Sequence, residues 1–325
     1  MRRALTPWLI AFGVAVLVAA GAVITLNATV FGPGAFVQIY LDALARGDVS
    51  DALSLPGVDP GAEAGAGGRS AALLHDGTLS GLSDIHQTGD ESRAGAHWIT
   101  VDWTSPHGSG TTTFQVQRIG TRFGLFPEWG FAASPVATVS LAVEHDPRFT
   151  VNGADELSTT GSSAPTDYTV LVPGAYVFAH SSRYLSAAPE LVLADTVGQT
   201  IAARVDTQAN ARLLGQVSSD VNEQLRSCTT QAVLFPTGCP YGQAIDNRVS
   251  SAPQWSLVAL PQIRIVPGEE FGSWAIPPTP GTAHLVVKVT SLLNGSVSEF
   301  NQDVPFRVAA TVTLDAEDDV RVTLR

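Results

Sequence analysis

The sequence predicts an α+β protein in which one apolar helix precedes three folded modules. A long uncharged segment stands near the N-terminus, helical periodicity follows residues 34 and 206, and short alternating segments between turn residues fill most of the remainder. One or two helices followed by antiparallel strands is the arrangement of an α+β module. The expected divisions are 1–7, a cytoplasmic stub; 8–27, a transmembrane anchor; 33–132, a cone-like α+β domain; 135–205, a small all-β, sandwich-like module; and 206–325, a helix-plus-antiparallel-sheet domain.

The anchor prediction depends on the segment Trp8–Leu26. It has 19 residues without a charge, and as a helix it reaches about 28 Å, close to the thickness of a bilayer core. Arg2 and Arg3 are the only charged residues before it, and positive charge beside a first span holds that end in the cytoplasm. We therefore expect residues 28–325 to be extracytoplasmic. The alternative is a signal peptide cleaved near Ala20–Ala22, but the apolar run continues to Leu26, which favours an uncleaved anchor.

Composition limits the partners and the redox state. A hydrophobic content of 45% with 15% charged residues predicts a folded chain. The net charge of −12 repels nucleic acid, phospholipid headgroups and polyphosphate, so no nucleic acid partner is expected. Cys228 and Cys239 are the only cysteines. Two thiols in an oxidising compartment usually pair, so a disulfide between them is expected.

The first domain should open with a helix over about Ala35–Arg46, ended by Gly47, and Asp48 should cap a short second helix. The apolar residues of the first helix recur at helical spacing, at Val37, Tyr40, Leu41 and Leu44. Strands are expected at Trp98–Thr104, Thr112–Ile119 and Arg122–Phe126, with Gly120-Thr121 as the last turn.

The middle module shows only strand signals. Asn152-Gly153 predicts a hairpin turn. Pro173-Gly174 predicts a tight turn in which Gly174 has a positive φ. The expected strands are Val136–Val143, Asp167–Val172, Ala175–His180, Leu191–Leu193 and Thr200–Val205.

The last domain should begin with an amphipathic helix capped by Asp206 or Thr207. One apolar stripe defines the buried face of this helix: Ala211, Leu214, Val217, Val221, Leu225 and Cys228. A bridge to Cys239 would tie the helix end to the following loop. The strands expected after it are Trp255–Leu260, Ile263–Val266, His284–Leu292, Phe306–Leu314 and Val320–Leu324, with turns at Asn294-Gly295 and at 315–319.

Three short stretches carry a resemblance to a known family. They are residues 36–48 (FVQIYLDALARGD), residues 151–153 with 171–176 (VNG and LVPGAY), and Cys228 with residues 235–241 (FPTGCPY). On these stretches the chain resembles actinobacterial relatives of the teicoplanin-resistance-associated membrane protein TcaA. The resemblance implies an anchor followed by extracytoplasmic modules of nuclear transport factor 2-like and PEGA-like type. The zinc ribbon usual in that family needs four cysteines, which this sequence does not contain.

No catalytic motif is present. The sequence has no Gly-x-Ser-x-Gly elbow, Ser-x-x-Lys pair, His-Glu-x-x-His motif or phosphate-binding glycine loop. Tyr40, Asp102 and His107 would be the acid–base residues of a pocket in a cone-shaped first domain. Strand alternation instead places Asp102 on a solvated face and His107 in a loop. We therefore predict no catalytic, cofactor-binding or metal-binding residue.

Two further residue groups have a binding and a structural interpretation. The acidic tract Asp315, Glu317, Asp318 and Asp319 offers calcium ligands, but it lacks a twelve-residue ligand loop and is expected to be a solvated turn. The five tryptophans that follow the apolar N-terminal segment would either line a ligand groove or pack in cores, and core packing is expected. They are Trp98, Trp103, Trp129, Trp255 and Trp274.

The function expected from these features is non-enzymatic. The chain would be a single-pass cell-envelope protein that presents binding or scaffold domains to an envelope protein or cell-wall component, and the resemblance suggests a link to antibiotic response. The alternatives are an exported enzyme and an accessory subunit of a membrane complex. A pocket with convergent polar groups would favour the enzyme. Solvent-exposed Asp102 and His107 would favour the interaction protein, and an exposed apolar patch near the membrane would favour the accessory subunit.

Overall fold

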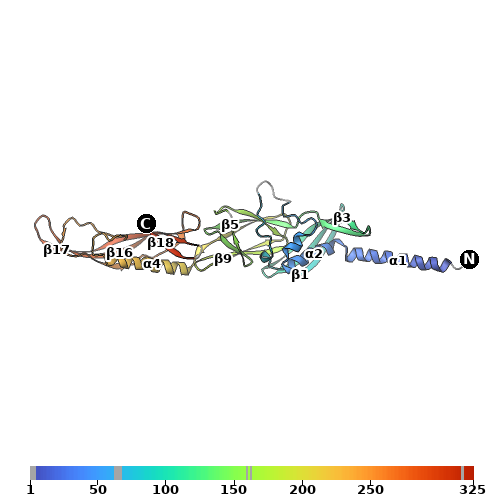
Figure 1. The fold of residues 1–325 in the computed structure, drawn as a ribbon, viewed down its shortest axis with the longest axis horizontal. Coiled ribbons are helices and arrows are strands. Elements are labelled where there is room, and N and C mark those ends of the chain that lie inside the picture. The colour runs from blue at the N-terminus through green and yellow to red at the C-terminus, as the bar shows by residue number, and fades with distance from the viewer. Residues whose placement is uncertain (1–4, 62–67, 159, 162, 316–317) are drawn as a thin grey trace.

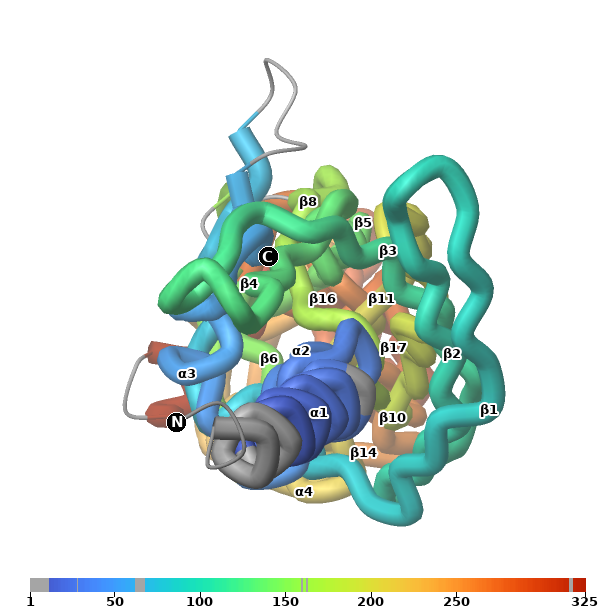
Figure 2. Tube along the Cα trace, turned by 90° about the vertical axis from the view of Figure 1, so that its right-hand side faces the viewer, coloured from blue at the N-terminus to red at the C-terminus, as the bar shows by residue number. Residues whose placement is uncertain are grey.

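The computed structural model describes residues 5–61, 68–158, 160–161, 163–315 and 318–325. Three β-sheet modules follow one another along one axis, and helix α1 (Leu5–Thr29) projects from one end (Figure 1). Figure 2 looks along this axis from the α1 end, with the modules lying behind one another. Strands predominate and helices are few, so the predicted α+β class is confirmed.

Helix α1 includes the whole apolar run of the expected anchor. Its described side chains begin at Phe12, and most are exposed, including Phe12, Leu17 and Ile24. Arg2 and Arg3 lie outside the described residues. Among the residues that are described, no helix is both long enough and apolar enough to cross a membrane.

In the first module, two helices pack on one antiparallel sheet. Helix α2 (Pro33–Arg46) contacts all four strands through its buried face and ends at Gly47, whose φ is 73°. Asp48 then caps α3 (Val49–Leu53) by accepting a hydrogen bond of 2.9 Å from the Asp51 N–H. The strands lie in sequential order: β1 (Ser83–Arg93), β2 (Ala96–Ser105), β3 (Gly108–Arg122) and β4 (Phe126–Phe131).

The edges of this sheet differ from the sequence prediction. Strand β1 is polar and none of its residues is buried, so its sequence shows no alternation of apolar and polar side chains. Its backbone hydrogen bonds to β2 hold it in place. Gly120 lies inside β3 opposite Glu128. The chain turns instead at Phe123 and Gly124, where φ is 54° and 68°. The predicted turn at Gly120-Thr121 and the strand Arg122–Phe126 are therefore wrong.

The second module is a sandwich of two sheets with the orders β12-β10-β9-β6-β7 and β11-β5-β8. All pairings are antiparallel except β5 with β11, which is parallel. Residues from both sheets form the core, including Val139, Phe149, Tyr168 and Phe178. The strands are β5 (Val136–Glu144), β6 (Arg148–Val151), β7 (Ala154–Leu157), β8 (Thr166–Leu171), β9 (Gly174–Ser181), β10 (Leu185–Ala194), β11 (Thr200–Asp206) and β12 (Gln208–Ala209).

The two predicted turns of this module have different outcomes. Asn152 and Gly153 join β6 to β7 with positive φ values of 50° and 90°, which confirms the hairpin turn. Gly174 is not among the residues with positive φ, so that prediction is wrong. The reason for a glycine there is contact: a Cβ at Gly174 would lie 2.8 Å from Cε2 of Tyr176.

The third module places helix α4 (Ala211–Thr229) on a six-stranded antiparallel sheet. Strands β13 (Arg248–Val249), β14 (Gln254–Ala259) and β15 (Val266–Pro267) each pair with β16 (Ser273–Thr290). On its other side β16 pairs with β17 (Val297–Leu314), and β17 pairs with β18 (Val320–Leu324). Two of the predicted strands are therefore halves of 18-residue strands.

Helix α4 corrects the sequence prediction at its start. The carboxamide oxygen of Asn210 accepts hydrogen bonds from the N–H groups of Arg212 (2.9 Å) and Leu213 (3.2 Å), so Asn210 is the cap rather than Asp206 or Thr207. Leu213 is fully buried, whereas Leu214 is 38% exposed. The buried stripe is Leu213, Val217, Val221, Leu225 and Cys228.

Buried contacts join consecutive modules. The Tyr40 hydroxyl of α2 lies 2.8 Å from the Val172 carbonyl and 3.2 Å from the Pro135 carbonyl, both in the second module. Leu185 of β10 belongs to the hydrophobic core of the third module. The Gly272 N–H donates to the His145 carbonyl at 3.1 Å.

Candidate functional site

The three residues considered for acid–base chemistry do not converge. Tyr40 is fully buried between the first two modules, and burial raises its pKa well above 10. Asp102 is exposed on β2, where it accepts a hydrogen bond of 2.6 Å from the Thr111 hydroxyl. His107 is exposed in the turn between β2 and β3. Tyr40 therefore has a structural role, and the other two residues lie on solvated surface.

The acidic tract forms a turn that also contacts the second module. The Asp315 carboxylate accepts a hydrogen bond of 2.7 Å from the Asp319 N–H. Asp318 pairs with Arg148, with Nη1 3.2 Å from Oδ1. Glu317 lies outside the described residues.

The five tryptophans do not form one groove, because three belong to the first module and two to the third. Trp103 and Trp274 are fully buried. The Trp255 indole N–H donates to the Val233 carbonyl at 2.8 Å, and the Trp129 indole N–H donates to the Phe31 carbonyl at 2.8 Å.

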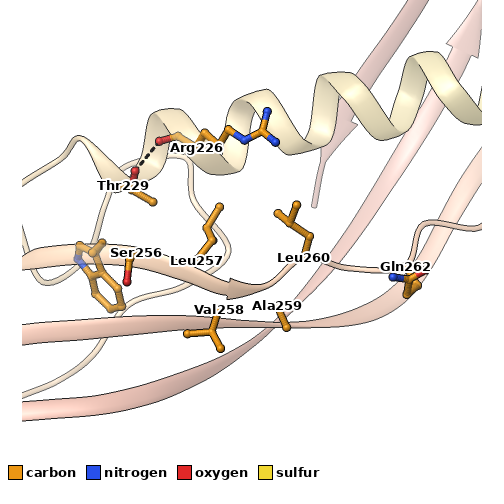
Figure 3. Close-up of a pocket in the computed structure, with 9 residues that line it drawn as sticks. Arg226, Thr229, Ser256, Leu257, Val258, Ala259, Leu260 and Gln262 are labelled. Carbon is orange, nitrogen blue, oxygen red and sulfur yellow. Dashed lines mark hydrogen bonds between the residues drawn. The ribbon is translucent and has the colours of Figure 1, made fainter.

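The largest cavity among those described, about 620 Å³, is an open groove between α4 and β14. Figure 3 shows that Arg226 and Thr229 of α4 form one wall and β14 with the residues after it forms the other. The side chains of Leu257 and Leu260 point towards the helix, whereas Val258 and Ala259 point away from it. The lining is Arg226, Thr229, Trp255, Ser256, Leu257, Val258, Ala259, Leu260 and Gln262.

The local sequence explains why the groove walls are held in place. The buried stripe of α4 packs against the sheet, and a disulfide ties Cys228 at the end of α4 to Cys239, with the two Cα atoms 5.9 Å apart. The predicted pairing of the cysteines is therefore present. Tyr241 follows the bridge, packs against Trp255 at a ring distance of 5.0 Å, and donates to the Leu225 carbonyl at 3.2 Å. Burial raises the pKa of Tyr241 to about 12, so its hydroxyl stays a donor at neutral pH.

Two properties of the groove bear on what it binds. Within the described part of the chain, β14 pairs only with β16, so its other edge has no strand partner and its outward backbone N–H and C=O groups are available for pairing. Arg226 is the only charged residue in the lining, and no ion pair involves its guanidinium among the described residues. The groove therefore combines an open strand edge, apolar side chains and one cation.

A polar cluster that the sequence analysis did not identify lies at the junction of the second and third modules. Ligand atoms of Glu144, His145 and Asp206 lie within 4.8 Å of one another, a spacing that would suit a metal ion. Arg204 contacts both carboxylates, with Nη2 3.3 Å from Oδ2 of Asp206. Because the Arg204 guanidinium already pairs with both carboxylates, we interpret the cluster as an ion-pair network between the parallel strands β5 and β11. The sequence does not indicate this cluster, because its residues meet only when β5 pairs with β11, which is distant in the chain.

A second cluster nearby is more buried. The Arg148 guanidinium donates two hydrogen bonds to the Asp146 carboxylate, of 2.9 and 3.0 Å, and these bonds raise the pKa of Arg148. His180 is 5% exposed, and its Nε2 has no hydrogen-bond partner among the described residues. Burial lowers the pKa of His180, so the ring is neutral at pH 7.

Comparison with known proteins gives no relative: no protein-family model, no curated protein and no solved structure matches the chain.

Proposed function

We propose that this protein is a non-enzymatic, single-pass cell-envelope protein that binds an extended polypeptide segment in the groove between α4 and β14. The position of that groove carries the proposal. It lies in the module farthest from α1, at the other end of an elongated molecule (Figure 1). A binding surface held away from a membrane anchor is suited to reaching a partner in the envelope.

The anchor part of the proposal is supported by the exposure of α1. Most of the apolar side chains from Phe12 to Leu26 are exposed, because the rest of the chain does not cover them. Exposed apolar surface of this extent is unfavourable in water and favourable in a bilayer. The N-terminus would then be cytoplasmic and the modules extracytoplasmic.

The binding part is supported by the chemistry of the groove. An extended segment that adds to a sheet edge obtains main-chain hydrogen bonds, and adjacent pockets select its side chains. Leu257 and Leu260 would contact apolar side chains of the segment, and Arg226 would pair with a carboxylate. The expected ligand is therefore a segment that alternates apolar and acidic residues. Antibiotic response, suggested by the resemblance, is the phenotype to assay.

The binding proposal can be tested with synthetic peptides. The full-length chain in detergent is titrated with two acetylated peptides, one alternating Val and Glu and one alternating Val and Lys. We expect the Glu peptide to bind and Arg226→Glu to reverse the preference. A matched control is Arg212→Glu, which makes the same charge change at an exposed position of α4 outside the groove. Equal binding of both peptides, or equal effects of the two substitutions, would contradict the proposal.

The anchor is tested separately in cells. Alkaline carbonate should leave the chain in the membrane, and external protease should reach residues beyond 28. Recovery of a mature chain that begins near Val23 would show a cleaved signal instead.

A second function, accessory subunit of a membrane complex, is favoured by one observation. Exposed apolar side chains gather where α1 meets the first module: Val30, Ile39, Ile119, Phe123 and Leu125. This is the apolar patch expected of such a subunit.

A further inference from the structure

We infer that the turn between β3 and β4, together with the surface beside it, rests in the headgroup region of the bilayer. This inference rests on the proposed anchoring by α1, and it adds a second, peripheral membrane contact. We name this surface the membrane pad and define it by Val30, Ile39, Ile119, Phe123 and Leu125.

The pad is joined to the end of α1 by specific contacts. The side-chain amide of Asn27 donates to the Leu125 carbonyl at 3.1 Å. The rings of Phe31 and Phe126 lie 4.4 Å apart, and the Trp129 indole N–H donates to the Phe31 carbonyl at 2.8 Å. Figure 1 shows β3 reaching the level at which α1 leaves the first module. If α1 spans the bilayer, these contacts hold the turn at the membrane surface.

The exposure of the pad is unfavourable in water. Phe123 is 86% exposed and Leu125 is 58% exposed, although both belong to a tight turn with no need for large apolar side chains. Beside the turn, an apolar cavity of about 470 Å³ is lined by Phe36, Ile39, Ile119 and Trp129, among others. Apolar patches of this kind on a folded surface indicate a contact with a membrane or a partner.

The charges around the pad favour lipid as the occupant. Arg118 lies in β3 before the turn, and Arg122 at the turn lines the cavity. The Nε atom of Arg122 lies 3.5 Å from Oε1 of Glu128, and both side chains are exposed. The long apolar stem of arginine suits the interface, where the guanidinium can reach phosphate oxygens. Tryptophan, represented here by Trp129, is also typical of that depth. The chain as a whole is acidic, so these arginines are a local exception that points to anionic lipid.

The experiment places an environment-sensitive dye on the turn. Phe123→Cys is labelled in the full-length chain without reductant, so that Cys228 and Cys239 remain bridged. The labelled chain is reconstituted in phosphatidylcholine vesicles with or without phosphatidylglycerol, some containing lipid that carries a quencher near the headgroup. The matched control is Leu293→Cys, an apolar position in the turn between β16 and β17 that is 95% exposed, at the end of the molecule opposite α1.

We expect the quencher to act on the label at 123 and not on the label at 293. An arginine near an anionic surface shifts a binding equilibrium about fivefold at low salt. Arg118→Gln and Arg122→Gln should therefore each weaken the dependence of quenching on phosphatidylglycerol by about that factor. Carbonate extraction of the same vesicles tests the anchor independently.

Two results would overturn the inference. Absence of quenching at 123 in a chain that carbonate does not extract would leave the anchor in place and remove the lipid contact. A label at 123 that is shielded only in native membranes, where it crosslinks to a protein or to a second copy of the chain, would assign the pad to a protein partner.

Discussion

At the residue scale, Gly174 shows that a glycine can be required for a reason other than the positive φ that its sequence context suggests. The sequence suggests a left-handed glycine, whereas the structure shows a glycine that makes room for Tyr176. The Tyr176 ring cannot easily move, because it is fully buried and its hydroxyl donates to the Leu171 carbonyl at 2.8 Å. Neither burial nor this contact is visible in the dipeptide Pro173-Gly174.

This cause predicts that even alanine is harmful at Gly174. Gly174→Ala should lower the free energy of unfolding by about 1–3 kcal/mol through overpacking. Gly215→Ala is the control, because a Cβ there meets no atom within 4 Å and alanine is the better helix former in α4. It should raise stability by about 1 kcal/mol. Urea unfolding of both variants followed by tryptophan fluorescence checks the opposite signs, and a neutral Gly174→Ala would show that Tyr176 can move.

His180 predicts a loss of stability in mild acid. Burial lowers its pKa in the folded state below 6.5, and the nearby charges of Asp146 and Arg148 act in opposite directions. Below pH 6.5 the unfolded chain binds the proton and the folded chain does not, so stability falls as the pH drops from 6.5 towards the folded-state pKa. Wild type should therefore lose more stability between pH 7.5 and 5.5 than His180→Gln does. His107→Gln, which changes an exposed histidine, should keep the wild-type pH dependence; identical profiles for wild type and His180→Gln would refute the argument.

At the element scale, the helices were largely predictable because their periodicity is strong. The spacing of Val37, Tyr40, Leu41 and Leu44 is the spacing of the buried face of α2. The groove was not predictable, because its walls are separated in sequence and meet only when β14 pairs with β16. Strand β1 was missed for a related reason: its backbone ladder, rather than buried side chains, fixes it.

The disulfide predicts an asymmetry between its two cysteines. Cys228 is 1% exposed in the core under α4, whereas Cys239 is only partly buried in the loop. Either substitution by serine removes the bridge, which in the chain-entropy treatment costs about 3 kcal/mol for a loop of this length. Cys228→Ser should cost more than Cys239→Ser, because it also buries a hydroxyl in an apolar site. Thermal unfolding of both variants without reductant measures the difference, and equal losses would place the whole effect in the bridge.

At the scale of the whole molecule, the three modules are linked more closely than their separation along the chain suggests. Tyr40 joins the first module to the second, and the ion pair of Arg148 with Asp318 joins the second to the third. The helical periodicity, strand alternation and turn signals of the sequence predict three modules. They do not predict these contacts, because each pairs residues more than 100 positions apart or depends on which face of a strand is buried.

Strand β10 links the second and third modules directly, because its two ends belong to different hydrophobic cores. Leu185 is fully buried in the core of the third module, whereas Val192 is buried in the core of the second. Leu185→Ala should cost about 2–5 kcal/mol. Hydrogen exchange should then accelerate in α4, which shares that core, and not in β5 and β8. Val192→Ala, the matched control in the same strand, should produce the reverse pattern. If both substitutions accelerated exchange in the same elements, the two cores would unfold as one unit and the modules would not be independent.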